Sequence, residues 1–253
     1  MLRVSDLALG YGEEPVVEGV SLEVSGGKFV SLVGPSGSGK TSILRAITGL
    51  LTPRGGRVEL NGSQDSIGFL FQDDALLPWR SARENVALGL RIRKASKDTA
   101  LTEADTWLKR LGLEGFGGRF PHELSGGQRK RVAIAQVLIL KPKLLLMDEP
   151  FASLDAIVRT RLTQELLTWV EREHMSVLLV THDLEEALTV SDTVYLLSQG
   201  PRARMRKSYA ISIPRPRDVF ATRRDPSFAP LLEQLWKDMF DEASPAQVEA
   251  IIK

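Results

Sequence analysis

The sequence predicts an α/β fold with a parallel core sheet, and three stretches of different texture support this prediction. Residues 1–60 contain short apolar or alternating runs separated by glycine turns, a pattern typical of strands. Residues 82–120 instead repeat apolar side chains at helical spacing, with charged residues between them. From residue 144 onward, apolar strands alternate with helices, which is the pattern of a parallel sheet.

The composition is that of a globular protein and excludes several classes of function. With 253 residues the chain can bury a sizeable core. Its 33 basic and 32 acidic residues give a net charge of +1, so there is no positive excess for binding nucleic acid. No apolar run approaches the ~20 residues that cross a bilayer, and the N-terminus lacks a signal-peptide pattern, which favours the cytoplasm. The absence of cysteine excludes disulfides and thiolate metal sites.

The N-terminal elements are predicted from short apolar runs and the turns between them. Five strands are expected, at residues 4–9, 20–24, 29–33, 58–60 and 67–71. Gly55-Gly56 and Asn61-Gly62 are turn signals on either side of the fourth strand. A helix is expected at residues 41–50, after the third strand, because its apolar residues fall on one side.

The middle of the chain predicts a helical subdomain at about residues 79–136, inserted in one domain that spans residues 1–253. The apolar residues that recur at helical spacing in it are Leu101, Ala104, Leu108 and Leu111. Beyond the subdomain, further strands are expected at residues 144–147, 177–180 and 193–197.

Residues 201–253 predict a basic segment followed by an amphipathic helix. The basic side chains, against the single acid Asp218, are Arg202, Arg204, Arg206, Lys207, Arg215, Arg217, Arg223 and Arg224. This segment is interpreted as a solvated surface, with a position near anionic lipid headgroups as the alternative. Asp225-Pro226 predicts an N-cap and a first helical residue. The helix carries an apolar stripe that is expected to dock on the domain rather than on a partner; it consists of Leu231, Leu232, Leu235, Trp236, Met239 and Phe240.

A phosphate-binding loop lies between the third strand and the first helix. Residues 34–41, GPSGSGKT, fit G-x-x-x-x-G-K-[ST], the P-loop pattern. The glycines let backbone N–H groups approach phosphate oxygens, and the helix N-terminus adds the positive end of its dipole. Lys40 supplies charge for the β- and γ-phosphates, and the Thr41 hydroxyl suits Mg²⁺. The residues expected to contact the nucleotide are Gly34, Pro35, Ser36, Gly37, Ser38, Gly39, Lys40, Thr41 and Ser42.

Two adjacent carboxylates follow the apolar strand at residues 144–147. Asp148 ends this strand and is suited to hold Mg²⁺, directly or through water. Glu149 is the better candidate for the general base, polarising the water that attacks the γ-phosphate. Because such pairs also occur at ordinary solvated strand ends, the interpretation depends on the order of motifs in which this pair stands.

A third motif, Leu124-Ser125-Gly126-Gly127-Gln128, lies between the P-loop and these carboxylates. With the motifs in this order, the chain resembles the ATP-binding subunit of an ABC transporter over about residues 1–200. The resemblance implies a P-loop NTPase fold (ABC ATPase) with a parallel core sheet, an N-terminal antiparallel β-subdomain and an inserted α-helical subdomain. The LSGGQ segment is expected to open a helix at Gln128 and so to form a second anion-binding helix N-terminus.

The resemblance also assigns roles to single residues. Tyr11 matches the aromatic residue that stacks on adenine, although a surface tyrosine in a loop is the alternative. Gln72 matches the glutamine that reaches Mg²⁺ and the attacking water, Asp155 the residue that touches the partner subunit, and His182 the switch histidine. The residues matched to the nucleotide of the other subunit are Ser125, Gly126, Gly127 and Gln128. The implied catalytic set is Glu149, His182 and Gln72, and the implied metal set is Thr41, Gln72 and Asp148. His122 and His174 are expected at the surface.

The family resemblance further implies a head-to-tail dimer, in which each of two ATP molecules lies between one P-loop and the other subunit's LSGGQ. A homodimer is expected. The transmembrane permease subunits and a periplasmic or lipid-anchored solute-binding protein are expected as separate polypeptides. The chain is accordingly expected on the cytoplasmic face of the plasma membrane, as a peripheral subunit.

The importer type is indicated by three short stretches. Residues 72–80, QDDALLPWR, resemble the Q-loop of the nitrate, taurine and aliphatic-sulfonate import group. FASLD at 151–155 and RRDP at 223–226 fit the same group. Trp79 is expected either where the permease docks or in the local core. One departure is Gln136, which stands where relatives usually have arginine.

Three other functions are compatible with the motifs. The chain could serve a lipid-handling or export system, but residues 76–79, LLPW, and the C-terminal segment argue against this function. It could be a non-transport ABC protein, although it shows no zinc module, long coiled coil or duplicated cassette. It could also be a regulator that binds nucleotide without turnover, which Glu149 and His182 argue against. The sequence alone does not name the transported solute.

Overall fold

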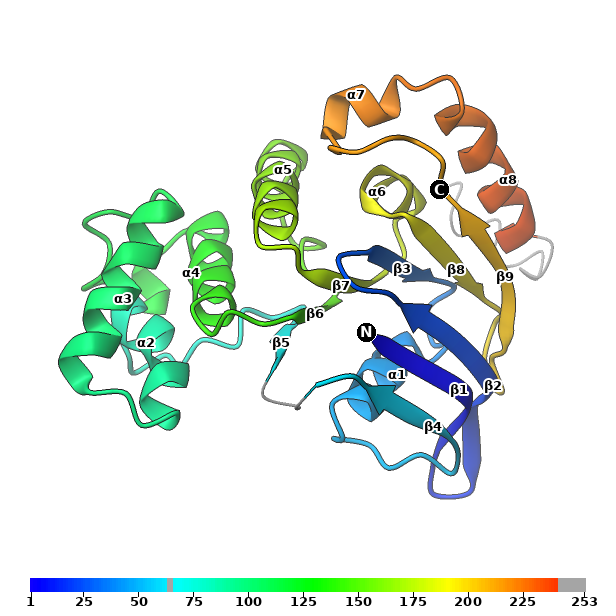
Figure 1. The fold of residues 1–253 in the computed structure, drawn as a ribbon, viewed down its shortest axis with the longest axis horizontal. Helices are drawn as coiled ribbons and strands as arrows, with labels where there is room; N and C mark the ends of the chain where they lie inside the picture. The colour runs from blue at the N-terminus through cyan, green and yellow to red at the C-terminus, as the bar shows by residue number, and fades with distance from the viewer. Residues whose placement is uncertain (63–65, 241–253) are drawn as a thin grey trace. The chain divides into compact units, whose positions relative to one another are not determined.

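The computed structural model describes residues 1–62 and 66–240, and the chain divides into two compact units (Figure 1). The first unit comprises residues 1–64 and 166–253, and the second comprises residues 65–165. Helix α5 (Ala156–Arg172) begins in the second unit and ends in the first. The arrangement expected from the sequence, one domain with a subdomain at 79–136, stays a prediction. Residues 241–253 of the expected C-terminal segment lie outside the described residues.

An antiparallel sheet in the first unit confirms the β-rich reading of the N-terminus. Its strands, in the order β2-β1-β4, are β1 (Leu2–Tyr11), β2 (Glu14–Val24) and β4 (Gly55–Leu60). The expected turn at Gly55-Gly56 is wrong, because these residues begin β4. Gly56 has φ +77°, and a Cβ there would lie 2.3 Å from the Asp6 carbonyl oxygen, where the β1–β4 register shifts. The glycines therefore serve a close backbone approach rather than a turn.

A second sheet in the first unit supplies the parallel core. Its strands, in the order β7-β3-β8-β9, are β3 (Phe29–Val33), β7 (Ser176–Thr181), β8 (Thr193–Leu197) and β9 (Met205–Ala210). β3 is parallel to β7 and β8, and every residue of β3 and β7 is buried, as the continuous apolar runs predict. β9 is antiparallel to β8. The sequence missed β9 because it lies in the basic segment and only Tyr209 of its residues is buried.

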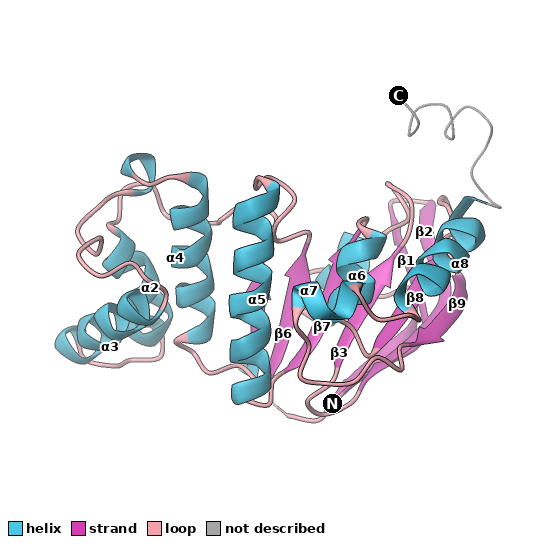
Figure 2. Ribbon diagram, turned by 90° about the horizontal axis from the view of Figure 1, so that it is seen from above, coloured by secondary structure: helices cyan, strands magenta, loops and turns pink. Residues whose placement is uncertain are grey.

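The helices of the first unit include two in its C-terminal part, of which the first lies within the basic segment and the second follows it (Figure 2). Besides part of α5 they are α1 (Lys40–Ile47), α6 (Leu184–Val190), α7 (Val219–Arg223) and α8 (Phe228–Phe240). The apolar stripe of α8, including Leu235 and Trp236, packs on a core formed with α6, β3, β8 and β9, which confirms the expected docking. α8 begins at Phe228 rather than at Pro226, because Asp225 instead accepts hydrogen bonds from Ser227 in a turn.

The second unit contains one strand pair and three helices that pack on one another. β5 (Ile67–Leu70) is parallel to β6 (Leu144–Asp148). The helices are α2 (Ala82–Ile92), α3 (Lys97–Arg110) and α4 (Gly126–Leu138), with a 3-10 turn at Pro121–Glu123. The predicted face of α3 is largely buried, since Ala104, Leu108 and Leu111 are all inaccessible. Over the described parts of both units, the helices are too short or too polar to cross a bilayer.

Candidate nucleotide-binding site

The P-loop joins the end of β3 to the start of α1. α1 begins at Lys40 with Gly39 as N-cap in the left-handed region, φ +86°, and without a side-chain cap. A Cβ on Gly39 would also lie 2.6 Å from the Val17 side chain. Gly37 has φ +79° in open space. These glycines are therefore needed for backbone conformation, and at Gly39 for packing as well. The result is a tight loop leading to an uncapped helix N-terminus, which is an arrangement that binds phosphate.

The Lys40 side chain lies over this loop. Its Nζ donates hydrogen bonds of 2.8 Å to the carbonyl oxygens of both Gly34 and Pro35. The side chain is buried, and its ammonium group is held by carbonyl oxygens of the same loop. The structure thus places a fixed positive charge beside the N-terminus of α1, as the motif predicts.

Tyr11 is brought to the same helix. It is the last residue of β1 and remains half-exposed, and its hydroxyl is 3.1 Å from the Ser42 Oγ in the first turn of α1. This hydrogen bond, with a smaller contribution from Arg45, lowers the pKa of the Tyr11 phenol below its usual value. Tyr11 is therefore not an isolated tyrosine of a surface loop, and its ring lies near the P-loop. Its stacking on adenine stays a prediction.

The register of the parallel strands places His182 beside the P-loop strand. Val33 at the end of β3 pairs with Thr181 at the end of β7, so Gly34 and His182 both leave the sheet at its carboxyl edge. Ligands of such sheets bind outside the carboxyl ends of the strands. The other two histidines, His122 and His174, are exposed as expected.

In the second unit the same argument brings Gln72 to the two carboxylates. Leu70 at the end of β5 pairs with Met147 in β6, so Gln72 and Glu149 each follow two residues beyond a paired position. Asp148 is 7% exposed. Glu149 has φ +43°, a left-handed conformation that is costly for a residue with a side chain and that is found preferentially at functional sites. The acid pair is therefore not an ordinary solvated strand end.

The LSGGQ segment forms the N-terminus of α4, but the expected first residue is wrong. α4 begins at Gly126, two residues before Gln128, because Ser125 is its N-cap. The Ser125 Oγ accepts from the Gln128 backbone N–H, and the Gln128 side chain accepts from the Ser125 N–H at 2.9 Å. This reciprocal pair is a capping box. A Cβ on Gly127 would lie 3.0 Å from the Val158 side chain in α5, so that position favours glycine.

Asp155 also caps a helix. Its carboxylate accepts a hydrogen bond of 3.0 Å from the backbone N–H of Val158, in the first turn of α5. The side chain is exposed. The structure thus shows a local role for Asp155, and its contact with a partner subunit stays a prediction.

Sequence reasoning missed a buried amide that holds the Q-loop, residues 72–80. Asn85 in α2 is fully buried. Its side chain accepts from the Leu77 N–H at 2.7 Å and donates to the carbonyl oxygens of Leu77, Arg80 and Ser81. The signal was an asparagine within the apolar pattern of a helix, which usually indicates a satisfied buried amide.

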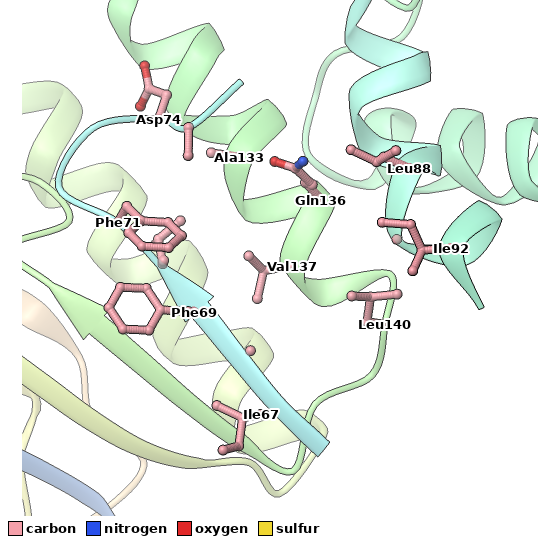
Figure 3. Close-up of a pocket in the computed structure, with 14 residues that line it drawn as sticks. Ile67, Phe69, Phe71, Asp74, Leu88, Ile92, Ala133, Gln136, Val137 and Leu140 are labelled. Atoms are coloured by element: carbon pink, nitrogen blue, oxygen red, sulfur yellow. The ribbon is translucent and has the colours of Figure 1, made fainter. Parts of the chain in front are cut away.

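A groove of about 250 Å³ lies in the second unit between β5, the Q-loop, α2 and α4 (Figure 3). Phe69, Leu88 and Leu140 line its apolar walls, and Gln136 contributes a polar side chain. Gln136, the departure from arginine, therefore faces this groove. In the adjoining Q-loop Trp79 is 72% exposed, so the alternative that it belongs to the local core is wrong.

The basic segment forms ion pairs within the first unit rather than a uniformly solvated surface. Short pairs join Arg204 to Glu18, Lys207 to Asp238 and Arg215 to Asp192, at 2.9, 2.7 and 2.7 Å respectively. Arg217 is 3% exposed and donates to the Ser191 carbonyl oxygen. The expectation of a solvated run is therefore wrong at Arg217, and much of the remaining charge is neutralised by acids of the same unit.

Comparisons with known proteins agree with these motifs. Residues 17–152 match the family described as ABC transporter. The chain is 37% identical over 250 residues to the taurine import ATP-binding protein TauB of Escherichia coli O157:H7, covering 96% of this chain and 98% of the relative. It is 42% identical over 206 residues to TauB of Yersinia pestis bv. Antiqua, covering 79% and 81%.

Solved structures show the same fold. The ATP-binding cassette MJ0796, solved as a dimer in a post-hydrolysis state with ADP and Pi, is 30% identical with a TM-score of 0.74, covering 85% of this chain and all of the cassette. The cbiO1 protein of Clostridium perfringens, part of the ABC transporter complex cbiONQ, is 27% identical with a TM-score of 0.75, covering 92% and 98%. These likenesses confirm the predicted α/β cassette fold.

Proposed function

This chain belongs to the ABC transporter family and is an ATPase subunit of that family, and on that basis we propose that it powers the import of a small sulfonate such as taurine. The observation that carries the proposal is the likeness to TauB over almost the whole of both chains, together with a P-loop built as the motif requires. The family membership confirms the resemblance drawn from the order of P-loop, LSGGQ and carboxylates.

The P-loop fits the phosphates of ATP. An uncapped helix N-terminus follows a loop whose glycines cannot carry side chains without strain or collision. The Lys40 ammonium lies over that loop, where it would interact with the β- and γ-phosphates. We assign the remaining contacts of the chain with its nucleotide to residues 34–42, and the adenine contact to Tyr11.

We also propose that the chain binds Mg²⁺ together with ATP. The hydroxyl of Thr41, the amide of Gln72 and the carboxylate of Asp148 are hard oxygen donors, which Mg²⁺ prefers. Mg²⁺ also takes phosphate and water oxygens as ligands, so these residues would share it with the nucleotide. When bound, Mg²⁺ would neutralise charge on the phosphates.

The catalytic proposal uses Glu149, Gln72 and His182, together with the P-loop lysine Lys40. Glu149, on its strained backbone, accepts a proton from the attacking water. Gln72 orients that water, and Lys40 stabilises negative charge on the phosphates. His182, at the carboxyl edge of the first unit's sheet, completes the proposed catalytic set. The LSGGQ residues 125–128 and Asp155 are proposed to act across a homodimer, and the dimeric cassette MJ0796 supports this reading.

The permease is proposed to dock at the groove of the second unit. The groove has apolar walls that include Ile92, which is 72% exposed. Trp79, which is in the Q-loop that contributes Asp74 and Ala75 to the groove, is also 72% exposed. A short amphipathic helix of a separate transmembrane subunit would cover such a surface. Docking there would hold the chain on the cytoplasmic face of the plasma membrane, as a peripheral subunit. A solute-binding protein would act through the permease.

A reconstituted complex tests the proposed function. The chain is combined in vesicles with its permease and solute-binding protein, and ATP hydrolysis is measured with taurine, alkanesulfonates, nitrate and pyrimidine precursors. We expect taurine or an alkanesulfonate to stimulate hydrolysis, with no stimulation in the Glu149→Gln complex. Stimulation by nitrate or a pyrimidine precursor alone would reject the sulfonate assignment, and stimulation by lipid alone would favour the lipid-handling alternative.

A variant pair tests the docking surface. Trp79→Asp and Ile92→Asp place charges on exposed side chains, so we expect normal folding but loss of the permease from the purified complex. The matched control is Leu50→Asp, because Leu50 is equally exposed, at 71%, in the other unit. If the complex survived both groove variants, the permease would dock elsewhere.

A further inference from the structure

The lysine that follows LSGGQ by two positions is buried against the backbone at the start of the Q-loop. Lys130 in α4 is 1% exposed. Its Nζ donates to the carbonyl oxygens of Gln72 at 3.0 Å and Phe71 at 3.4 Å. The same atom lies 2.9 Å from an oxygen of the Asp74 carboxylate. One ammonium group therefore contacts Phe71, Gln72 and Asp74, which all belong to the segment around Gln72.

The chemistry of this contact is specific to lysine. An ammonium group has three N–H donors and no acceptor, and the structure offers it three oxygens. Glutamine would supply two donors and place its own carbonyl oxygen among these acceptors, and methionine would supply no donor. The charge is buried, so it requires an acid partner, which Asp74 provides.

Asp74 extends the link to the LSGGQ segment. Its second carboxylate oxygen is 3.3 Å from the Arg129 Nε, and the Arg129 guanidinium donates at 2.7 Å to the carbonyl oxygen of Leu124. One carboxylate of the Q-loop is thus paired with two successive cations of α4. Figure 3 shows Asp74 on the loop that passes α4 above the groove.

We propose that Lys130 is a positioning residue that, with Asp74, clamps the backbone of Gln72 to the helix of LSGGQ. The inference rests on the proposed function, because it concerns the position of the residue proposed to orient the attacking water. The clamp makes Gln72 and the LSGGQ segment move together. Gln72 has an exposed side chain two residues beyond the end of β5, so contacts of its backbone, rather than packing of its side chain, hold it in place.

Hydrogen exchange and steady-state kinetics on the full chain test the clamp. In Lys130→Met, which keeps the length of the side chain but removes all three donors, we expect exchange of the amides of residues 71–77 to accelerate about tenfold. Exchange in α1 should stay within about twofold. We expect kcat for ATP to fall about tenfold with KM within about twofold, because the contacts of Lys130 described above are all with the Q-loop segment.

A double variant separates positioning from general destabilisation. If Lys130 acts through Gln72, then Lys130→Met adds no further loss of kcat in a Gln72→Ala background, whereas independent effects multiply. The matched control is Lys109→Met, which removes an exposed lysine paired with Glu114 in the same unit and should change neither readout. Asp74→Asn weakens the clamp and should give the same changes at about threefold; it replaces Lys130→Met if that variant does not fold.

The outcomes are distinguishable. Unchanged exchange of residues 71–77 in Lys130→Met or Asp74→Asn, or multiplicative losses of kcat with Gln72→Ala, would overturn the clamp. If Gln72→Ala kept full kcat, the proposed role of Gln72 would be wrong, and unaltered exchange alone would then refute the clamp. Accelerated exchange together with non-additive losses supports both.

Discussion

The two units each bury a lysine that donates to two backbone carbonyl oxygens, but the two lysines find their acceptors in different ways. Lys40 bonds to Gly34 and Pro35, which are six and five residues away in the chain. Lys130 bonds to Phe71 and Gln72, which are 59 and 58 residues away. The first contact is complete within one loop. The second exists only when β5 and α4 have come together.

The difference explains why a sequence motif predicts the Lys40 contact but not the Lys130 contact. The P-loop pattern records the lysine, its acceptors and the glycines between them in eight residues. The Lys130 contact leaves no pattern, because its acceptors are carbonyl oxygens that any residue supplies. We therefore expect substitutions in the first unit to disturb nucleotide binding, and substitutions in the second to disturb turnover or coupling.

The largest expected effect separates turnover from binding. Glu149→Gln removes the proposed base, so kcat for ATP should fall by about 10² to 10⁴, while nucleotide affinity stays near normal and a dimer accumulates with ATP. Lys40→Met should instead weaken ATP binding, because it removes the charge proposed to contact the β- and γ-phosphates. Isothermal titration and single-turnover hydrolysis measure the two quantities. Undiminished hydrolysis in Glu149→Gln would remove Glu149 from the base role.

A second prediction concerns the backbone of the P-loop. Gly39→Ala adds both left-handed strain, about 1–2 kcal/mol, and a collision with Val17, about 1–3 kcal/mol, to the folded state. Gly37→Ala adds the strain alone, since a Cβ there meets no atom within 4 Å. We expect urea unfolding to show a loss of stability of about 2–5 kcal/mol for Gly39→Ala and a smaller loss for Gly37→Ala.

The control for this pair is Gly26→Ala, where φ is ordinary and a Cβ meets no atom within 4 Å. It should not lower stability. Equal losses at Gly37 and Gly39 would show that the collision with Val17 relaxes, so that only the backbone conformation matters at the start of α1.

A third prediction tests the buried amide of the second unit. Asn85→Ala leaves the Leu77 N–H and several carbonyl oxygens of the Q-loop without their partner, which should cost about 1–3 kcal/mol. Because the hydrogen bonds of the Asn85 side chain all lie within the second unit, the affinity for ATP should not change, whereas association with the permease should weaken. Denaturant unfolding and nucleotide titration together check this. A loss of ATP affinity equal to the loss of permease binding would contradict the assignment of nucleotide binding to the first unit and of docking to the second.

The smallest effect is a pH dependence at the C-terminus of the first unit. Hydrogen bonds from Lys207 and then Tyr209 hold the pKa of Asp238 in α8 below its usual value. A lowered folded-state pKa means that this contribution is present above the unfolded value of about 3.9 and is lost as pH falls through the folded value.

We therefore expect α8 to loosen slightly below about pH 4. The measurement is the fluorescence emission of Trp236 in α8, which packs against the same core as Tyr209. Asp238→Asn should abolish the pH dependence of this signal. An identical acid transition in that variant would assign the effect to other carboxylates.

The sequence by itself determined the features whose partners are close in the chain. The P-loop and the buried strands were predicted, since each depends on spacing over a few residues. The capping pair of Ser125 and Gln128 was missed although its members are three residues apart, and α4 was expected to begin at Gln128 rather than at Gly126. The errors lay where a local signal has two physical uses. Gly55-Gly56 could have made a turn but instead fits a close approach of two strands, and Asp225 could have capped α8 at Pro226 but instead caps a turn.

Only the tertiary structure decided the contacts between distant segments. It made β9 an edge strand out of a basic run, neutralised Arg204 with Glu18 from β2, exposed Trp79, and placed Lys130 beneath Gln72. The physical reason is that every residue has a backbone carbonyl oxygen and many residues carry a charge, so the sequence offers many equivalent acceptors and ion-pair partners. Which of them meet depends on the packing of strands and helices, and no short pattern of residues records that choice.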